Sequence, residues 1–235
     1  MIMQEERPRT GSADSFSAGS ALLLDRARAG VVGIGAWVVT TPTIVLGSAQ
    51  RGAGSARLVR DGSAVSVARR ATGGGAVLCD GHLLIAAVAV PSGHPWAGSD
   101  VTEAYRPIAG AIAAYLTAGG TPAVLASPDA LSHGTEEARI ACWAGVGPYE
   151  VLVEGRKLVG LSQRRRGGAV LFEMGIPVSA GQDRLTAYLD LEPGRRDAVE
   201  AALARTTCLA ELGEADGPAG VWRGLRSELL RAVAG

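Results

Sequence analysis

The chain has few cysteines, a single lysine, no net charge and no long apolar run. Its three cysteines are a small and odd number, which excludes a disulfide framework and is typical of a protein of the reducing cytoplasm. The 23 Lys and Arg residues balance the 23 Asp and Glu residues, which argues against nucleic-acid binding through bulk charge. No secretion signal is recognisable, and no apolar run approaches the roughly 20 residues that span a bilayer. We therefore expect a globular cytoplasmic protein that binds neither nucleic acid nor membrane.

The sequence also lacks the spacing of a metal site. Its three histidines lie far apart, and no pair of cysteines has the spacing of a zinc site. At 235 residues the chain is long enough to bury a core without a disulfide or a structural metal. We expect no resident metal in the fold.

The apolar pattern predicts an α+β fold in which helices flank a mixed central sheet. Residues 1–18 are polar, so we expect a loose N-terminal tail, followed by one domain over 19–235 with a short helical C-terminus. Pro107 should kink the helix that follows Asp100, or delay its start. The expected strands are Val31–Val39, Thr43–Leu46, Val65–Arg69, Leu83–Val90, Arg139–Trp143, Tyr149–Val153, Lys157–Gln163 and Ala169–Phe172. The expected helices are Ser20–Arg28, Asp100–Gly119, Asp197–Cys208 and Ala219–Val233.

The segment Arg69–Val77, which reads Arg-Arg-Ala-Thr-Gly-Gly-Gly-Ala-Val, is the most informative stretch of the sequence. Three consecutive glycines are costly to order, so we expect them where the backbone takes positive φ or approaches another group closely. Arg69 and Arg70 would suit an anionic ligand, since guanidinium pairs well with carboxylate and phosphate. Taken alone, the motif also fits an exposed turn between two strands.

Lys157 is the second residue of interest, because it is the only lysine in a chain rich in arginine. It follows the predicted hairpin turn Glu154–Arg156 and opens a strand. A compact ammonium at this place could act as a point charge beside a carboxylate or phosphate. Spacing alone is equally consistent with a solvated lysine in a turn.

Three blocks together resemble the lipoate–protein ligase and octanoyltransferase family, which includes the biotin ligases. Arg69–Val77 with the strand Leu83–Val90 is similar to the glycine loop of that family. Thr41–Gln50 ends in Leu-Gly-Ser-Ala-Gln and is similar to its Leu-Gly-x-x-Gln corner. Ala141–Gln163, with Ala-Cys-Trp and Gly-Arg-Lys-Leu-Val-Gly-Leu-Ser-Gln, is similar to its cysteine-aromatic and lysine hairpin block. The blocks follow the family's order over about residues 20–190, and the resemblance implies the catalytic fold of the class II synthetases and biotin/lipoate ligases.

The resemblance implies first an ATP-dependent ligase. Such an enzyme converts lipoate or octanoate with ATP and Mg²⁺ into an acyl adenylate and then acylates a lysine of a lipoyl carrier domain. Lys157 would contact the adenylate, where its charge would stabilise the negative charge that develops on the oxygens. The carriers would be lipoyl domains of 2-oxoacid dehydrogenases or the glycine-cleavage carrier protein. The residues that bind substrate and adenylate would be Arg69, Arg70, Thr72, Gly73, Gly74, Gly75, Ala76, Gly160 and Ser162.

The resemblance leaves two alternatives open. In its octanoyltransferase branch, Cys142 would be a nucleophile that forms a thioester without ATP, although a free cysteine often only packs. The family's usual His-Gly pair is absent here, where Glu173 and Met174 precede a glycine, and Cys79 stands where a histidine is common. These departures would fit a non-catalytic paralogue that only binds an acyl group. The two-domain ligases of the family carry an added C-terminal domain, whereas here only a short helical segment follows residue 190. We therefore expect an accessory subunit to take part in adenylation.

Overall fold

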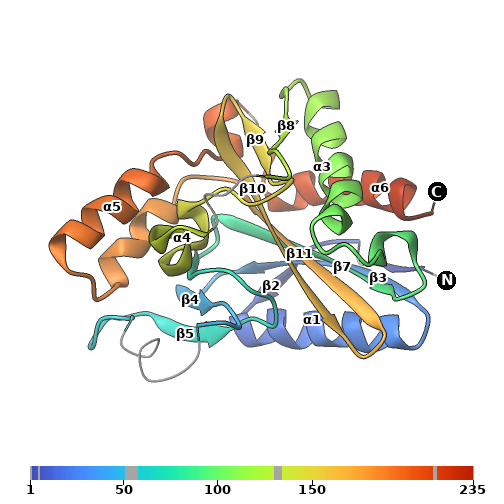
Figure 1. Cartoon of the computed structure of the whole chain (residues 1–235), viewed down its shortest axis with the longest axis horizontal. Coiled ribbons are helices and arrows are strands. Elements are labelled where there is room, and N and C mark those ends of the chain that lie inside the picture. Colours follow the sequence, from blue (N-terminus) through green and yellow to red (C-terminus); the bar gives the residue numbers. More distant parts are fainter. Residues whose placement is uncertain (1, 5, 51–57, 130–133, 214–215, 235) are drawn as a thin grey trace.

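The computed structural model of the chain describes residues 2–4, 6–50, 58–129, 134–213 and 216–234, and its centre is a mixed β-sheet (Figure 1). The strand order of this sheet is β1-β3-β7-β11-β10-β9-β8, and β2 also pairs with β3. A three-stranded sheet of order β5-β4-β6 lies beside it. The main sheet is formed by β1 (Ile2–Gln4), β2 (Arg9–Gly11), β3 (Val32–Val39), β7 (Leu83–Pro91), β8 (Val124–Leu125), β9 (Val151–Val153), β10 (Arg156–Arg166) and β11 (Ala169–Pro177). The small sheet is formed by β4 (Thr43–Leu46), β5 (Ser66–Arg69) and β6 (Val77–Cys79).

Strand β7 occupies the middle of the main sheet, between β3 and β11, and is antiparallel to both. Residues Leu83–Val90 are all apolar and all buried. A continuous apolar run is expected of a strand that is covered on both faces. The predicted strand is therefore confirmed, together with the α+β fold of a mixed sheet flanked by helices.

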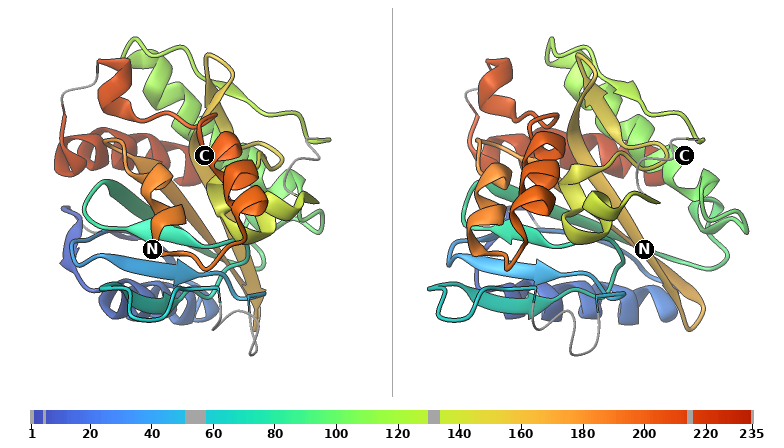
Figure 2. Two further views of the ribbon diagram at one scale, coloured as in Figure 1. Left: turned by 90° about the vertical axis from the view of Figure 1, so that its left-hand side faces the viewer. Right: turned by 60° about the vertical axis from the view of Figure 1, so that its left-hand side comes forward.

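Helices cover the two faces of the sheet differently. Helices α3 (Arg106–Ala118) and α6 (Pro218–Ala234) pack against each other over one face. Helix α1 (Ala13–Arg28) packs on the opposite face, beside the small sheet (Figures 1 and 2). Helices α4 (Glu136–Ile140) and α5 (Pro193–Leu203) contact one another at the left-hand end of the molecule in Figure 1, where β4 and β5 also lie. Two apolar cores result, one on each face of the sheet.

The expectation of a loose tail over residues 1–18 is wrong for the residues that the structure describes in that range. Arg9–Gly11 pairs in parallel with β3, and α1 begins at Ala13 rather than at Ser20. Ser12 caps this helix, because its hydroxyl accepts a hydrogen bond from the amide of Ser15 at 3.3 Å. Phe16 is buried against Trp37 in an edge-to-face contact with ring centroids 5.7 Å apart. The segment is therefore ordered by its capping residue and by one aromatic anchor.

The expected strand Arg139–Trp143 is also wrong. The chain forms helix α4 and then a 3₁₀ turn over Cys142–Ala144, which we call the cysteine turn. Thr135 caps α4 through the amide of Ala138, and two glutamates occupy its first turn, where the helix dipole favours negative charge.

The hairpin predicted across Glu154–Arg156 is confirmed, with Arg156 already in β10. The two residues that join β9 to β10 are Glu154 and Gly155, and both have positive φ, as in a type I′ turn. Strand β10 continues through Arg166 and does not end at Gln163 as predicted, so the turn that leads into β11 is formed by Gly167 and Gly168 alone.

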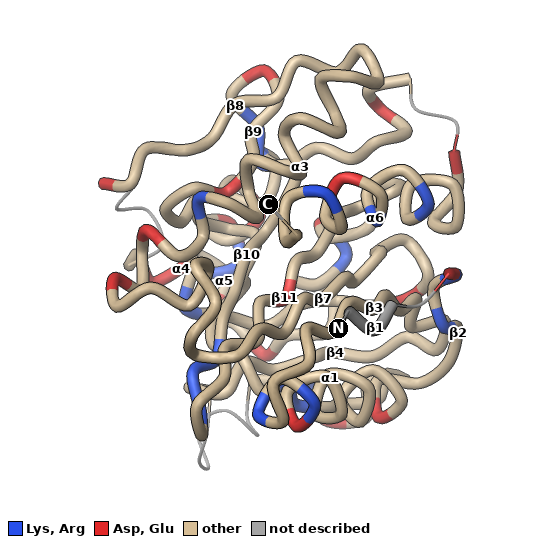
Figure 3. Tube along the Cα trace, turned by 90° about the vertical axis from the view of Figure 1, so that its right-hand side faces the viewer, with Lys and Arg blue, Asp and Glu red and all other residues tan. Residues whose placement is uncertain are grey.

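The remaining helices differ from expectation mainly at their ends. Pro107 lies in the first turn of α3, so it delays the start of the helix to Arg106 and does not kink it. Helix α5 spans Pro193–Leu203 and ends earlier than predicted, whereas α6 matches its prediction closely. Within the described ranges, no helix is both long and apolar enough to cross a membrane. Basic and acidic residues are interspersed along the chain (Figure 3).

Candidate functional site

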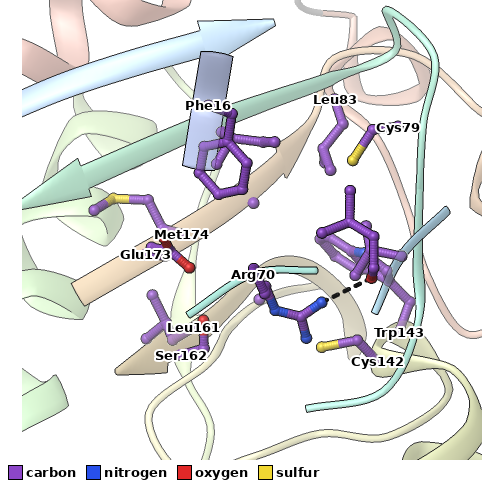
Figure 4. A pocket seen from close by; sticks show the side chains of 15 residues that line it. Phe16, Arg70, Cys79, Leu83, Cys142, Trp143, Leu161, Ser162, Glu173 and Met174 are labelled. Atoms are coloured by element: carbon purple, nitrogen blue, oxygen red, sulfur yellow. Dashed lines mark hydrogen bonds between the residues drawn. The ribbon is translucent and has the colours of Figure 1, made fainter. Parts of the chain in front are cut away.

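Two cavities meet at Cys142. The narrow cavity, of about 50 Å³, lies between the two sheets and is mostly apolar. Its wall includes Ile85 as well as Phe16 and Leu83, which Figure 4 shows. The wide cavity, of about 600 Å³, lies beyond the cysteine turn, and its lining residues include Lys157 and the three glycines of the loop. Three residues line both cavities: Cys142, Leu161 and Ser162. The half-buried Cys142 therefore lies where the narrow cavity meets the wide cavity.

Arg70 holds the glycine loop in shape. Its guanidinium is buried and donates to the carbonyls of Gly73 at 2.7 Å and Gly75 at 2.9 Å, and to that of Val45 at 3.0 Å. Because the loop curls around this side chain, its carbonyl oxygens point inward to the cation. Arg70 thus acts inside the protein, where it also lines the narrow cavity.

Gly74 explains why the loop needs glycine. Its φ of +96° is in the region that residues with a Cβ rarely adopt. A methyl group at this position would lie 2.8 Å from Nη2 of Arg70 and 3.1 Å from Sγ of Cys142. Arg70, Gly74 and Cys142 therefore meet at one point, with the guanidinium close to the thiol sulfur (Figure 4).

Backbone hydrogen bonds fasten the cysteine turn to the glycine loop. The amide of Cys142 donates to the carbonyl of Ala76 at 3.0 Å, and the amide of Ala76 donates to the carbonyl of Ile140 at 2.8 Å. Gln50, in the corner that follows β4, adds a third connection, because its side-chain amide donates to the carbonyls of Arg139 at 3.0 Å and Ile140 at 3.3 Å at the end of α4. The position of the thiol is fixed by these three connections.

Lys157 anchors the same turn from the other side. Its ammonium group is buried and has three donors, and the structure offers it three acceptors. These are the carbonyls of Cys142 at 3.0 Å and Gly145 at 2.8 Å, and the carboxylate of Glu150 at 2.7 Å. Its nitrogen also lies 5.2 Å from the ring centroid of Trp143, within cation–π range. Contact with a substrate oxygen would require one of the three acceptors to be replaced.

The other two cysteines are less suited to chemistry. All three are free, but Cys79 and Cys208 are buried, whereas Cys142 is half-buried. Burial raises the pKa of Cys79 to about 12, although the charge of Arg70 acts in the opposite direction. Burial also raises the pKa of Cys208. Since the thiolate is the reactive form, Cys142 is the best placed nucleophile of the three.

A polar chain runs from the junction of the cavities into the protein. Ser162 donates to the hydroxyl of Thr72 at 2.9 Å, and Thr72 donates to Oε2 of Glu173 at 2.5 Å. Glu173 is 4% exposed and lines the narrow cavity. Burial raises the pKa of this carboxyl group, while the hydroxyl of Thr72 lowers it.

The predicted residues fall into three groups. Gly73, Gly74, Gly75 and Lys157 line the wide cavity, Arg70 and Gly160 line the narrow one, and Cys142 and Ser162 line both. Thr72 and Ala76 lie behind the lining and contact it. Arg69 is exposed, lies outside the lining of both cavities and donates to the carbonyl of Gln50.

Three residues of the site were not found from the sequence. Phe16 lies in the segment predicted to be loose, where the capping Ser12 was the available signal. Glu150 pairs with the only lysine, a contact that spacing does not reveal. Glu173 was noted only as a departure from the family pattern, although an acid within an apolar strand is itself a signal.

The chain is similar to known proteins both in sequence and in fold. Several bacterial proteins named octanoyltransferase LipM are similar in sequence, and that of Moorella thermoacetica is 37% identical over 128 residues, which are 54% of this chain and 46% of that protein. The chain thus spans about half the length of the curated relatives that it matches.

In fold it is similar to the bipartite lipoate protein ligase of Thermoplasma acidophilum, with a TM-score of 0.73 at 17% identity over 97% of this chain and 84% of that one. It is also similar to a lipoate-protein ligase A bound with ATP, with a TM-score of 0.66 at 18% identity over 96% and 83%. Residues 21–219 match the family described as the lipoyl protein ligase A/B catalytic domain. Because this match covers most of the chain, the protein belongs to the lipoyl protein ligase A/B catalytic-domain family.

Proposed function

We propose that the protein is an octanoyltransferase that carries the acyl group as a thioester on Cys142. The observation that carries this proposal is the position of the Cys142 thiol between the narrow, apolar cavity (the slot) and the wide cavity (the groove). An acyl chain in the slot would put its carbonyl carbon at the sulfur, and the groove would admit the carriers that deliver and receive it. The similarity to octanoyltransferases named LipM supports the same activity.

The reaction would proceed in two steps: a thioester forms on Cys142, and a lysine amine then cleaves it. The Cys142 thiolate attacks the carbonyl carbon of an octanoyl thioester on an acyl carrier, and the bond to the carrier sulfur breaks as the new one forms. The carrier leaves as a thiol with the proton that Cys142 lost. A lysine amine of a lipoyl domain then attacks the Cys142 thioester, so that an amide forms and the thiol of Cys142 regains a proton. The acceptors would be lipoyl domains of 2-oxoacid dehydrogenases or the glycine-cleavage carrier protein.

Arg70 and Lys157 would support these steps from different positions. Arg70 places a fixed positive charge beside a sulfur that is negative both when it attacks and when it leaves. Lys157 holds the carbonyl groups on both sides of the cysteine turn, so it would act as a positioning residue. Neither role requires a nucleotide.

The narrow cavity must widen to admit an eight-carbon chain, because its volume is only about 50 Å³. Leu83, Leu161 and Met174 lie in its wall and can change rotamer, and methionine adapts to irregular space with little cost. The surrounding strands would then remain in place while side chains move. The apolar wall would hold the hydrocarbon part of the acyl group.

The second candidate is the adenylate-forming ligase, which the size of the wide cavity and its glycine loop favour. Mg²⁺ that accompanies ATP is usually held by carboxylates together with phosphate oxygens. Among the described residues that line the wide cavity, Glu150 alone carries a carboxylate. Its oxygens are engaged by Lys157 and by the amides of Gly147 at 2.7 Å and Leu161 at 3.0 Å. These residues do not fit Mg²⁺, so we derive no step through ATP.

The test is to trap the thioester. The protein is incubated with an octanoyl acyl-carrier thioester without ATP, quenched in acid and analysed by intact mass and peptide mapping. We expect a gain of one octanoyl group on Cys142, which is lost when an unmodified lipoyl domain is added and appears on that domain. Cys142→Ala should abolish both signals, while the matched control Cys208→Ala, at a buried cysteine outside both cavities, should retain them.

Two other results would contradict the proposal. Modification of the lipoyl domain only with free lipoate or octanoate and Mg-ATP, undiminished in Cys142→Ala, would establish the ligase. No transfer under either condition, together with binding of the free acids in calorimetry, would indicate a non-catalytic paralogue.

A further inference from the structure

Glu173 is a buried acid in the wall of the narrow cavity that the proposed reaction does not use. It lies on β11 in the sequence Leu-Phe-Glu-Met-Gly, with apolar neighbours on both sides. Its oxygen Oε2 accepts the hydrogen bond from Thr72, whereas Oε1 has no hydrogen-bond partner among the described residues. A buried polar atom without a partner is unusual in a native protein and calls for an explanation.

No described residue around Glu173 forms an ion pair with its carboxyl group. Arg70 and Arg164 are near enough to lower its pKa, but the nitrogens of Arg70 donate to backbone carbonyls, and Arg164 donates to the carbonyl of Ala71 at 2.8 Å. Ser20 faces it from α1, and its buried hydroxyl is near enough to lower the pKa of Glu173 as a hydrogen-bond donor does, but it makes no hydrogen bond of ordinary geometry within the described part of the chain. Burial, which raises the pKa of Glu173, is the largest influence on it. The carboxyl group accepts hydrogen bonds when it is ionised, and can both donate and accept when it is protonated.

A saturated acyl chain would suit the apolar wall of the cavity but would leave Oε1 without a partner. A chain with a hydroxyl group would supply one, because a hydroxyl can accept from a protonated carboxyl group or donate to an ionised one. A site that pairs a buried polar group with its substrate also discriminates strongly against an analogue that lacks the partner. The unpartnered oxygen is thus a potential determinant of specificity.

We propose, on the basis of the transfer reaction inferred above, that the narrow cavity selects a medium-chain acyl group that carries a hydroxyl on its chain, and that Glu173 hydrogen-bonds to it. Thr72 and Ser162 hold the carboxyl group in place through the other oxygen. Glu173 would then be a specificity-determining residue and would take no part in bond formation.

The experiment compares acylation of Cys142 by octanoyl thioesters that each carry one hydroxyl at a different carbon, with plain octanoyl thioester as the reference. In competition, intact mass distinguishes the products. We expect the wild-type protein to prefer one hydroxylated isomer over octanoyl by about 5- to 10-fold in kcat/KM, the range of one hydrogen bond between neutral groups. Glu173→Met should lose this preference, and Glu173→Gln, which keeps a donor and an acceptor, should retain most of it. Ile85→Val, in the same wall, should change both rates equally.

The outcomes separate the two proposals. Acylation at equal rates, or a preference for plain octanoyl over every isomer, would refute the role of Glu173 and leave the transfer reaction intact. A water molecule in the place of the substrate hydroxyl would give this result. If no thioester formed with any substrate, the transfer reaction would be refuted. Calorimetry with free hydroxyoctanoates and octanoate would then test the narrow cavity itself. Equal affinities would overturn its selection of a hydroxylated chain, and tighter binding of one hydroxylated acid would support it.

Discussion

Substitution of Lys157 by methionine should destabilise the fold far more than removal of a surface cation. The buried carboxylate of Glu150 would keep two backbone donors but lose its counter-charge, and the carbonyls of Cys142 and Gly145 would lose their donor. Removal of one partner from a buried ion pair typically costs about 3–5 kcal/mol. For a chain of this length each kcal/mol corresponds to about 2–4 °C, so Tm should fall by roughly 6–20 °C.

Urea unfolding followed by tryptophan fluorescence measures this cost. The matched control is Arg231→Met, which removes an exposed ion pair with Glu228 on α6 and should cost less than about 1 kcal/mol. The double variant Lys157→Met with Glu150→Gln should recover a large part of the loss, because no charge then remains buried without a partner. If Lys157→Met were no more costly than Arg231→Met, the ion pair would not hold the turn and the reasoning would fail.

Three further predictions concern the loop, the cavity and the thiols. Gly74→Ala should destabilise the protein by about 1–2 kcal/mol in urea unfolding, because Gly74 has a positive φ. Gly110→Ala in α3, where the space around the glycine is open, should stabilise the protein by about 0.5–1 kcal/mol. Equal effects of the two substitutions would contradict this reasoning. Because burial raises the pKa of Glu173, the folded chain retains a proton that the unfolded chain releases. Above the usual carboxyl range the wild-type Tm should therefore fall relative to that of Glu173→Gln as the pH rises, and the two should converge in acid; parallel curves would refute this. Iodoacetamide should label Cys142 well before Cys79, whose pKa is about 12, as peptide mapping would show; comparable rates would contradict the assignment.

Much of the fold was predictable because it is encoded locally. The continuous apolar run of β7 and the hairpin at Glu154–Gly155 depend on neighbouring residues, and the structure shows both. The start of α1 was missed because Phe16 is ordered by contact with Trp37, which lies on another element. For α4 the signal was local, since Thr135 and the acidic first turn favour a helix, but the short apolar pattern of 139–143 suggested a strand.

The site was predictable to the extent that motifs mark it. The glycine loop, Cys142 and Lys157 were all named from the sequence, and the structure brings them to the same two cavities. The partners of these residues could not be named. Glu173 and Thr72 are 101 positions apart, so only the folded sheet reveals that they share a hydrogen bond. The same holds for the place of Glu150 beneath the cysteine turn.

The position of Cys142 at the junction of the two cavities has a kinetic consequence. If the narrow cavity holds the acyl chain, as proposed above, the acyl donor and the lipoyl domain would have to approach the sulfur through the same wide cavity. They could not be bound together, so the donor would have to depart before the acceptor entered. A ping-pong rate law follows, with parallel double-reciprocal plots and inhibition by an excess of either carrier that occupies the groove out of turn.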